Sequence, residues 1–186
     1  MIKDFNIIKT DIEDVKIITP FYREDDRGYF LKDFEKDIFQ EWGVENDIYE
    51  NFQSYSKHGV IRGLHFQTQN PQIKIVSTIV GKVHDIAVDL RKDSPTFGKY
   101  VDIILSDENH NRLWIPRGFA HGFEVISDFA IMSYKCIGKY ENNCDTGIRY
   151  DDPDIGIEWE IGNPIISERD GQLMSFKDFK DNYGGL

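Results

Sequence analysis

The sequence predicts an antiparallel β-sandwich or barrel with a few short peripheral helices. Three observations lead to this fold class. Runs of β-branched and aromatic residues follow one another at short intervals through the middle of the chain. Turn-forming sequences such as "DSPTFG" and "DENHN" separate these runs. Helix-like stretches are sparse and lie toward the two ends.

The central strands are the clearest elements of the pattern. Gly81 lies between the first two of them and indicates a tight turn or bulge, because glycine adopts backbone conformations that other residues avoid. The strands are expected at residues 74–80, 82–90, 100–106, 112–116, 121–127 and 130–137.

Two short helices complete the expected fold. The first spans 34–42, with Asp33 as its N-cap and Gly43 as its stop. The second spans 175–183 and opens at Ser175. Both are peripheral to the β-core.

Length and composition indicate one globular domain over residues 1–186. Of the 186 residues, 40% are hydrophobic and 13% are aromatic, which is enough to form a sizeable core. No repeat, linker or low-complexity segment divides the chain. We expect a β-core over about 20–165, followed by a C-terminal segment, 166–186, that holds a short helix.

Charge and cysteine content limit the classes of partner. The net charge of −11 and the pI near 4.8 argue against nucleic acid, although a few well-placed cations can still bind a small anion. Charges interrupt every apolar run of residues 1–16, so we expect neither a secretory signal nor a membrane helix. Cys136 and Cys144 form no disulfide framework or zinc motif. We therefore expect two reduced thiols in a cytoplasmic protein.

Several polar side chains interrupt strand-like runs that are otherwise apolar. His65 and Gln67 of "GVIRGLHFQ" share one face of a strand, because alternate side chains point the same way. Taken alone, His65 is a hydrogen-bonded core residue, a metal ligand or a proton-transfer base. Arg and Lys are rarely buried without an anionic partner, so their presence favours a pocket. The set comprises Arg62, His65, Gln67, Lys74, His84, His121 and Tyr134.

The segment "PRGFAHGF", residues 116–123, offers a metal-binding interpretation. P-x-G-x-x-H is the pattern of the second cupin motif, in which a turn leads into a strand that carries a metal-binding histidine. The H-x-H of the first cupin motif is absent, because His65 is followed by Phe66 and Gln67. A metal set drawn from His65, His84, His121 and Glu124 therefore remains a second possibility.

Several longer strings together resemble one family. They are "DDRGYF", "GVIRGLHFQ", "KIVSTIVGKVHDIAVDLRKDSPTFGKYV", "LWIPRGFAHGF", "YKC" and "YDDPDIGIEW". In this order and at these separations, between about Pro20 and Leu173, they resemble the dTDP-4-dehydrorhamnose 3,5-epimerase family of cupin-fold enzymes. The resemblance implies a β jelly roll, a homodimer, and epimerisation of a nucleotide-diphosphate 4-keto-6-deoxyhexose without a metal or organic cofactor.

The resemblance also implies a set of site residues. His65 matches the family's general base and Asp170 the aspartate that pairs with it, while Tyr134 matches the acid. Lys74 matches a lysine beside the keto oxygen of the sugar. The residues expected to bind substrate are Arg27, Arg62, Gln67, His121, Tyr140, Asp145, Arg169, Glu50 and Asn51, with Arg27 and Arg62 at the diphosphate or nucleotide.

This chemistry agrees with the residue types. A proton next to a ketone is removed by a base, provided that a cation or donor stabilises the enolate oxygen. Inversion then requires a separate acid on the opposite face. Because a 4-ketone activates both C3 and C5, one site can invert both carbons.

The chain departs from the family pattern at its nucleotide-binding residues. Glu50, Asn51 and Phe52 stand where the family usually has Q-D-N, and Lys32 stands where it usually has Glu. The nucleotide therefore stays open between dTDP, CDP and GDP, and inversion of C3 or C5 alone also stays open. Two rival functions are a metal-dependent cupin oxygenase or isomerase and a non-catalytic sugar-binding cupin.

Overall fold

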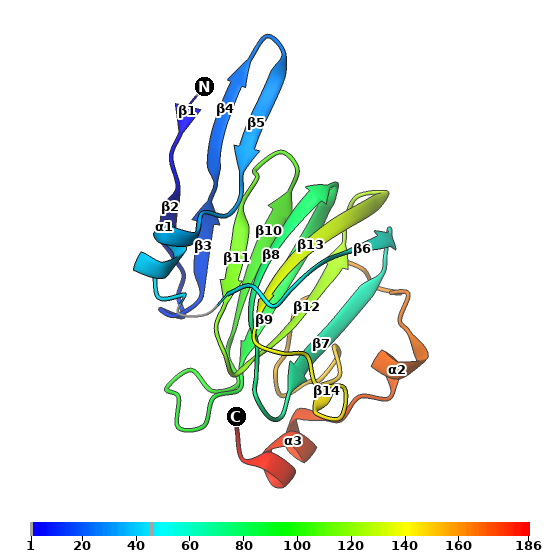
Figure 1. The fold of residues 1–186 in the computed structure, drawn as a ribbon. Coiled ribbons are helices and arrows are strands. Elements are labelled where there is room, and N and C mark those ends of the chain that lie inside the picture. The colour runs from blue at the N-terminus through cyan, green and yellow to red at the C-terminus, as the bar shows by residue number, and fades with distance from the viewer. Residues whose placement is uncertain (1, 45–46) are drawn as a thin grey trace.

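The protein is built from three antiparallel β-sheets, of which two face each other as a sandwich (Figure 1). The computed structural model describes residues 2–44 and 47–186. Helices are short and lie at the margins of the sheets. The expected antiparallel β fold with short peripheral helices is confirmed.

The first layer of the sandwich is a six-stranded sheet. In spatial order it contains β2 (Asn6–Lys9), β3 (Lys16–Thr19), β11 (Arg112–Ile115), β8 (Ile73–Val80), β13 (Phe129–Ile137) and β6 (Glu50–Lys57). The sheet thus begins earlier in the chain than the expected boundary near residue 20. The strands before that point are short and carry charges among their apolar residues, which hides the strand pattern in the sequence.

The second layer is a five-stranded sheet. In spatial order it contains β10 (Tyr100–Ser106), β9 (Lys82–Asp89), β12 (Phe119–Val125), β7 (Ile61–Gln67) and β14 (Asp145–Gly147). All six strands expected from the central part of the sequence are present in the two layers, to within two residues at each end. The turn expected at Gly81 joins β8 to β9, with φ +87°, and a Cβ there would lie 2.1 Å from the carbonyl oxygen of Phe129.

A third, three-stranded sheet forms an arm that extends beyond the sandwich (Figure 1). The arm consists of β1 (Ile2–Lys3), β4 (Phe21–Asp25) and β5 (Gly28–Lys32). Tyr29 and Phe30 of the arm are 58% and 60% exposed. These are large apolar side chains to leave in water, and that exposure is typical of a surface that another chain covers.

The main core lies between the two large sheets, because alternate residues of each strand point inward. Val83 and Ala87 of β9 pack there against Leu113 and Ile115 of β11. The outer face of the five-stranded sheet carries a second core, where Phe179 packs against Leu64, Ile86 and Val88. A third core, with Phe39 and Trp114, lies on the outer face of the six-stranded sheet.

The helices agree with the sequence in part. Ser175 caps α3 (Phe176–Tyr183) as expected, since its side chain accepts from the backbone N–H of Asp178. Helix α1 (Lys36–Glu41) starts later than expected, with Glu35 as its N-cap. The prediction of Asp33 as N-cap was wrong, because its carboxylate instead accepts from Lys135 at 2.5 Å.

A third helix, α2 (Glu168–Gly171), was not predicted. It lies in the C-terminal segment, where Ser167 caps it by accepting from the backbone N–H of Asp170. Both cysteines are free thiols, Cys136 buried and Cys144 partly exposed. Among residues 2–44 and 47–186, no helix has the length and apolar character needed to cross a bilayer.

Candidate active site

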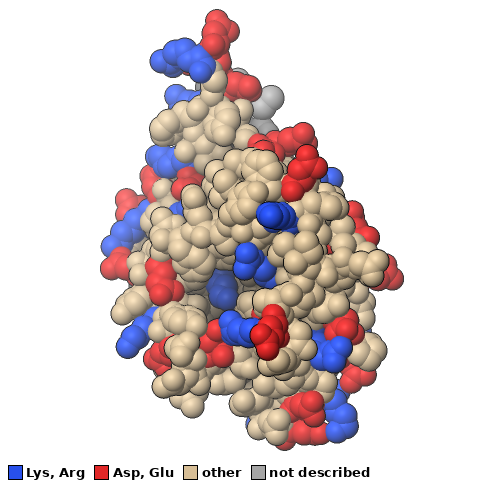
Figure 2. Space-filling model, turned by 90° about the vertical axis from the view of Figure 1, so that its right-hand side faces the viewer, with Lys and Arg blue, Asp and Glu red and all other residues tan. Residues whose placement is uncertain are grey.

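A cavity of about 300 Å³ opens between the two large sheets. Figure 2 shows Lys and Arg side chains gathered in and around this hollow, although the chain as a whole is acidic. Ten of the thirteen site residues that the family resemblance implies line it: Glu50, Arg62, His65, Gln67, Lys74, His121, Tyr134, Tyr140, Asp145 and Arg169. The folded chain therefore brings residues from both sheets and from α2 to one place.

His65 and Asp170 form a hydrogen-bonded pair at one wall of the cavity. His65 Nε2 lies 2.7 Å from Asp170 Oδ1, and the other carboxylate oxygen accepts from the backbone N–H of Gly63 at 3.2 Å. Burial acts to raise the pKa of Asp170, but the contacts with His65 and Gly63 outweigh it, so that the pKa lies below its usual value. The carboxylate is therefore charged at neutral pH and holds the imidazole with Nε2 protonated. That tautomer leaves Nδ1 as the basic nitrogen.

Two glycines bring β7 and β12 close together behind this wall. A Cβ on Gly63 would lie 2.6 Å from the Cα of Gly122, so no other residue fits at that crossing without displacing a strand. The strand register then sets His121 opposite His65. His121 Nε2 contacts both carboxylate oxygens of buried Asp85 at 3.0 Å. A second histidine–carboxylate pair thus lies beside the first.

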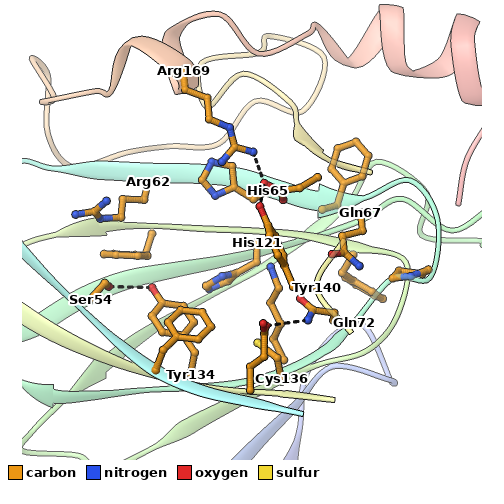
Figure 3. Close-up of a pocket in the computed structure, with 18 residues that line it drawn as sticks. Ser54, Arg62, His65, Gln67, Gln72, His121, Tyr134, Cys136, Tyr140 and Arg169 are labelled. Carbon is orange, nitrogen blue, oxygen red and sulfur yellow. Dashed lines mark hydrogen bonds and ion pairs between the residues drawn. The ribbon is translucent and has the colours of Figure 1, made fainter. Parts of the chain in front are cut away.

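Tyr134 reaches the cavity from the opposite sheet, on β13 (Figure 3). Its hydroxyl lies 3.3 Å from Ser54 Oγ, and its ring stacks on Phe52 with centroids 4.7 Å apart and an angle of 13°. Burial raises the pKa of the Tyr134 hydroxyl well above its usual value, so the group carries its proton at neutral pH. His65 and Tyr134 therefore face each other across the cavity, an imidazole opposite a protonated phenol.

Lys74 enters the same cavity from β8. The strand register places Cys136 of β13 opposite Lys74 on one side and opposite Glu50 of β6 on the other. Burial lowers the pKa of the Lys74 ammonium, while the charges of Asp145 and Asp85 act in the opposite direction. Burial likewise raises the pKa of the Cys136 thiol to about 11, so this thiol is neutral. Lys74 is thus the basic side chain in the floor of the site, and its neighbour Cys136 is a neutral thiol.

Two arginines border the cavity. Arg62 is anchored by its Nε, which donates to Ser56 Oγ at 2.9 Å. Arg169 donates to Asp145 at 2.5 Å, and the Tyr140 hydroxyl donates to the same carboxylate at 3.2 Å. Guanidinium groups suit phosphate oxygens because their N–H donors are planar and permanently charged.

Gln67 shares the face of His65, as strand alternation predicts, but its amide is engaged with the chain itself. Its Nε2 donates to the carbonyl oxygens of Asn70 and Lys139 at 2.9 and 3.2 Å, and its Oε1 accepts from the N–H of Glu141 at 2.7 Å. Gln67 therefore holds the loops that carry Tyr140 and shapes the rim of the cavity.

Two residues expected at the substrate lie away from this cavity. Asn51 falls between Glu50 and Phe52 on β6, and strand alternation turns it to the other face of the sheet. Arg27 lies in the turn of the arm, where it donates to Asp25 at 2.5 Å. Within one chain, neither residue lines the cavity, and their assignment to the substrate stays a prediction.

The metal set considered from the sequence is not assembled. His65 and His121 face the cavity, whereas His84 and Glu124 lie on the other face of the five-stranded sheet, one strand position away. There His84 contacts Glu124 at 2.9 Å and Asp102 at 3.1 Å. Across the described residues, no group of three His, Cys, Asp or Glu side chains is placed to hold a metal ion.

The structure also adds residues that sequence reasoning missed. Asp85 is a charged residue within the apolar run "KVHDIAVDL", and that position was a usable signal. Ser54 and Gln72 line the cavity without any such signal, because serine and glutamine are ordinary in strands and turns. Phe52, which the sequence marks only as a departure from the family pattern, also lines it. Gln72 donates to Glu50 at 3.3 Å and so fixes a carboxylate in the wall.

This arrangement suits proton transfer at carbon. A planar or ring-shaped substrate held between the sheets meets an imidazole on one side and a phenol on the other. Lys74 lines the same cavity, and an ammonium group at such a position suits an oxygen that gains negative charge. A site built in this way can remove a proton from one face of a carbon and return one to the opposite face.

Comparisons with known proteins agree with this chemistry. The family described as dTDP-4-dehydrorhamnose 3,5-epimerase matches residues 9–178. The chain is 46% identical to the dTDP-4-dehydrorhamnose 3,5-epimerase of Methanothermobacter thermautotrophicus, over 96% of this chain and 97% of that one.

Solved structures give the same result. The crystal structure of the dTDP-6-deoxy-D-glucose-3,5-epimerase of Legionella pneumophila in complex with dTDP-4-keto-L-rhamnose superposes with a TM-score of 0.89, at 42% identity over 92% of this chain and 93% of that one. A 4-keto-6-deoxy sugar epimerase from Streptomyces spheroides superposes with a TM-score of 0.91, at 34% identity over 96% and 91% of the two chains.

Proposed function

The chain belongs to the dTDP-4-dehydrorhamnose 3,5-epimerase family of isomerases with a cupin-type jelly roll, and we propose that it converts dTDP-4-dehydro-6-deoxyglucose to dTDP-4-dehydrorhamnose by inverting C3 and C5. The observation that carries this proposal is the placement of His65 and Tyr134 on opposite walls of one cavity, with Lys74 between the same sheets. The family relatives named above supply the substrate class.

The first step removes a proton next to the ketone. His65 Nδ1 takes the proton from C3 or C5, and the bonding electrons move into the ring to form an enolate at the C4 oxygen. Asp170, 2.7 Å from the other ring nitrogen, stabilises the imidazolium that results. The ammonium of Lys74 stabilises the enolate oxygen, which is where charge develops.

The second step returns a proton to the opposite face. Tyr134 donates its phenolic proton to the same carbon, the enolate electrons return to form the C–H bond, and the ketone is restored. The sugar has lost one proton and gained one, so substrate and product have the same composition. His65 then releases its proton to solvent and Tyr134 takes one up, which restores the enzyme. Repetition at the second carbon completes the double inversion.

The anionic part of the substrate is proposed to lie toward the two arginines. Arg62 and Arg169 border the opening of the cavity and offer charge-assisted hydrogen bonds to a diphosphate. Binding energy from this remote group positions the sugar between the proton-transfer residues. The Legionella relative was crystallised with a dTDP sugar, and this supports dTDP over CDP or GDP as the nucleotide here.

Arg27 fits the proposal if the protein is a homodimer. Within one chain it lies in the turn of the arm, away from the cavity, and the arm also exposes Tyr29 and Phe30. We infer that the arm of one copy covers the other copy and carries Arg27 to the nucleotide. Sedimentation should give a dimer, and Arg27→Ala should raise KM while leaving kcat unchanged. A monomer with full activity would contradict this arrangement.

A cytoplasmic location is proposed with the same function. The two free thiols, Cys136 and Cys144, suit a reducing compartment.

The function is tested by NMR of the dTDP-, CDP- and GDP-linked 4-keto-6-deoxyglucose incubated with the protein in D₂O. We expect deuterium at both C3 and C5 of an inverted product for the dTDP sugar. Deuterium at one carbon alone would identify a mono-epimerase. Binding without any deuterium incorporation from the three substrates would make the protein a sugar-binding cupin and would refute the proposal.

A further inference from the structure

The Tyr134 ring is a buried part of the main core, and three side chains contact it at the cavity wall. Phe52 of β6 lies flat against one face of the ring, at 4.7 Å and 13°. His121 meets it edge-on, with centroids 6.2 Å apart and an angle of 74°. Ser54 Oγ lies 3.3 Å from the hydroxyl. Of these three partners, only Phe52 has no polar group. It stands where the family resemblance implies a polar nucleotide contact, and its phenyl ring stacks on Tyr134 instead.

We propose that Phe52 is a positioning residue that holds Tyr134 in the orientation from which it protonates the sugar. This inference rests on the proposed function, because it assigns Tyr134 the acid step. A tyrosine side chain has two rotatable bonds, and a hydrogen bond to Ser54 at 3.3 Å restrains only its far end. The stacked phenyl ring of Phe52 restrains its plane.

The position of Phe52 within its strand supports this role. Phe52 and Ser54 are alternate residues of β6, so both point to the Tyr134 side of the sheet. The β6–β13 register sets Phe52 directly opposite Tyr134, which makes the stacked pair a cross-strand contact. Phe52 is nevertheless 47% exposed, so it contributes little to the hydrophobic core. Its main contact is therefore the stacking of its ring on Tyr134.

The two chemical steps respond differently if this is correct. His65 belongs to the other sheet and is positioned by Asp170, so proton abstraction does not depend on Phe52. Reprotonation on the opposite face does depend on it, through Tyr134. Loss of the phenyl ring should therefore leave deuterium exchange into the substrate and slow the formation of inverted product.

The test compares Phe52→Leu, Phe52→Tyr and the wild type with the dTDP 4-keto sugar in D₂O. Leucine keeps an apolar side chain without the flat ring, and tyrosine restores the ring. The matched control is Tyr55→Leu on the same strand, since Tyr55 points to the other face and stacks on Phe129. NMR follows two rates for each protein: deuterium entering unreacted substrate, and formation of inverted product.

We expect Phe52→Leu to exchange deuterium within about twofold of the wild type and to form inverted product about two- to tenfold more slowly, the range that an aromatic pair contact represents. KM should stay within about twofold, as expected for a step after binding. Phe52→Tyr and Tyr55→Leu should resemble the wild type.

Equal loss of both rates in Phe52→Leu, a rise in KM instead, or no loss of inverted product would overturn the inference. So would an equal effect of Tyr55→Leu. The wild type separates this inference from the proposed function: if the wild type neither exchanges nor inverts, the function itself is wrong, whereas an active wild type makes the variants decisive for Phe52.

Discussion

Replacement of Asp170 by asparagine tests how the base is organised. The carboxylate accepts two hydrogen bonds, from His65 Nε2 at 2.7 Å and from the N–H of Gly63 at 3.2 Å. An asparagine has one oxygen and one amide NH₂ in place of the two carboxylate oxygens. If its oxygen faces His65, two donors meet at Gly63. If its NH₂ faces His65, the imidazole must hold its proton on Nδ1, and the basic nitrogen is lost.

The size of the effect follows from these contacts. A hydrogen bond to a charged group is worth about 1.5–3 kcal/mol, and about 1.4 kcal/mol corresponds to a tenfold change in rate. The imidazolium formed on proton abstraction loses such a bond in Asp170→Asn, so kcat should fall about 10- to 200-fold. The lost contact with Gly63 or His65 should also lower the free energy of unfolding by about 1 kcal/mol.

The assay is the initial rate of deuterium incorporation from D₂O, with thermal unfolding measured on the same samples. Glu168→Gln is the matched control, because it removes an exposed carboxylate from the same helix, α2, and should leave the rate within about twofold of the wild type. A rate for Asp170→Asn within about threefold of the wild type, with the fold intact, would show that the carboxylate does not organise the base.

Three further outcomes are expected. Tyr134→Phe should keep deuterium exchange into substrate, while inverted product falls about 100-fold or more by NMR, the usual contribution of a general acid; normal inversion would refute the acid role. Arg62→Lys should raise KM about tenfold without lowering kcat, because lysine lacks the planar pair of donors; an unchanged KM in steady-state kinetics would remove Arg62 from the phosphate site. Burial acts to lower the pKa of His84, but the contacts with Glu124 and Asp102 raise it overall. The ion pairs of protonated His84 therefore stabilise the folded state fully below about pH 6.5, and this stabilisation is lost as the pH rises through the folded-state pKa. Urea unfolding should therefore show a larger loss in His84→Gln at pH 5.5 than at pH 9, and an equal loss at both would contradict the ion pair.

The central strands could be predicted from the sequence, whereas the N-terminal ones could not. Residues 74–137 alternate turn chemistry with apolar runs, and each run became a strand. The strands Asn6–Lys9 and Lys16–Thr19 are short, contain few apolar residues, and are stabilised by pairing with each other and with β11. Such tertiary pairing overrides local pattern. Asp33 has the composition of an N-cap, but its ion pair with Lys135 joins residues 102 positions apart, which local sequence cannot reveal.

The site was predicted as a set of residues, but not as an arrangement. Strand alternation places His65 and Gln67 on one face, and the motifs add Asp170. Nothing in local sequence shows that Asp170 approaches His65 from a four-residue helix, or that Phe52 stacks on Tyr134. Those contacts depend on how the two sheets and the C-terminal segment pack. Arg27 shows the converse, because its motif is clear while a single chain leaves it outside the cavity.

The proposed mechanism requires that His65 removes a proton from the carbon next to the ketone. The most direct measurement is solvent deuterium incorporation into the dTDP 4-keto sugar by His65→Ala beside the wild type, at equal protein concentration and with the fold checked by circular dichroism. We expect incorporation at both C3 and C5 for the wild type and none for His65→Ala above the rate without protein. Incorporation by His65→Ala at the rate of the wild type would contradict it.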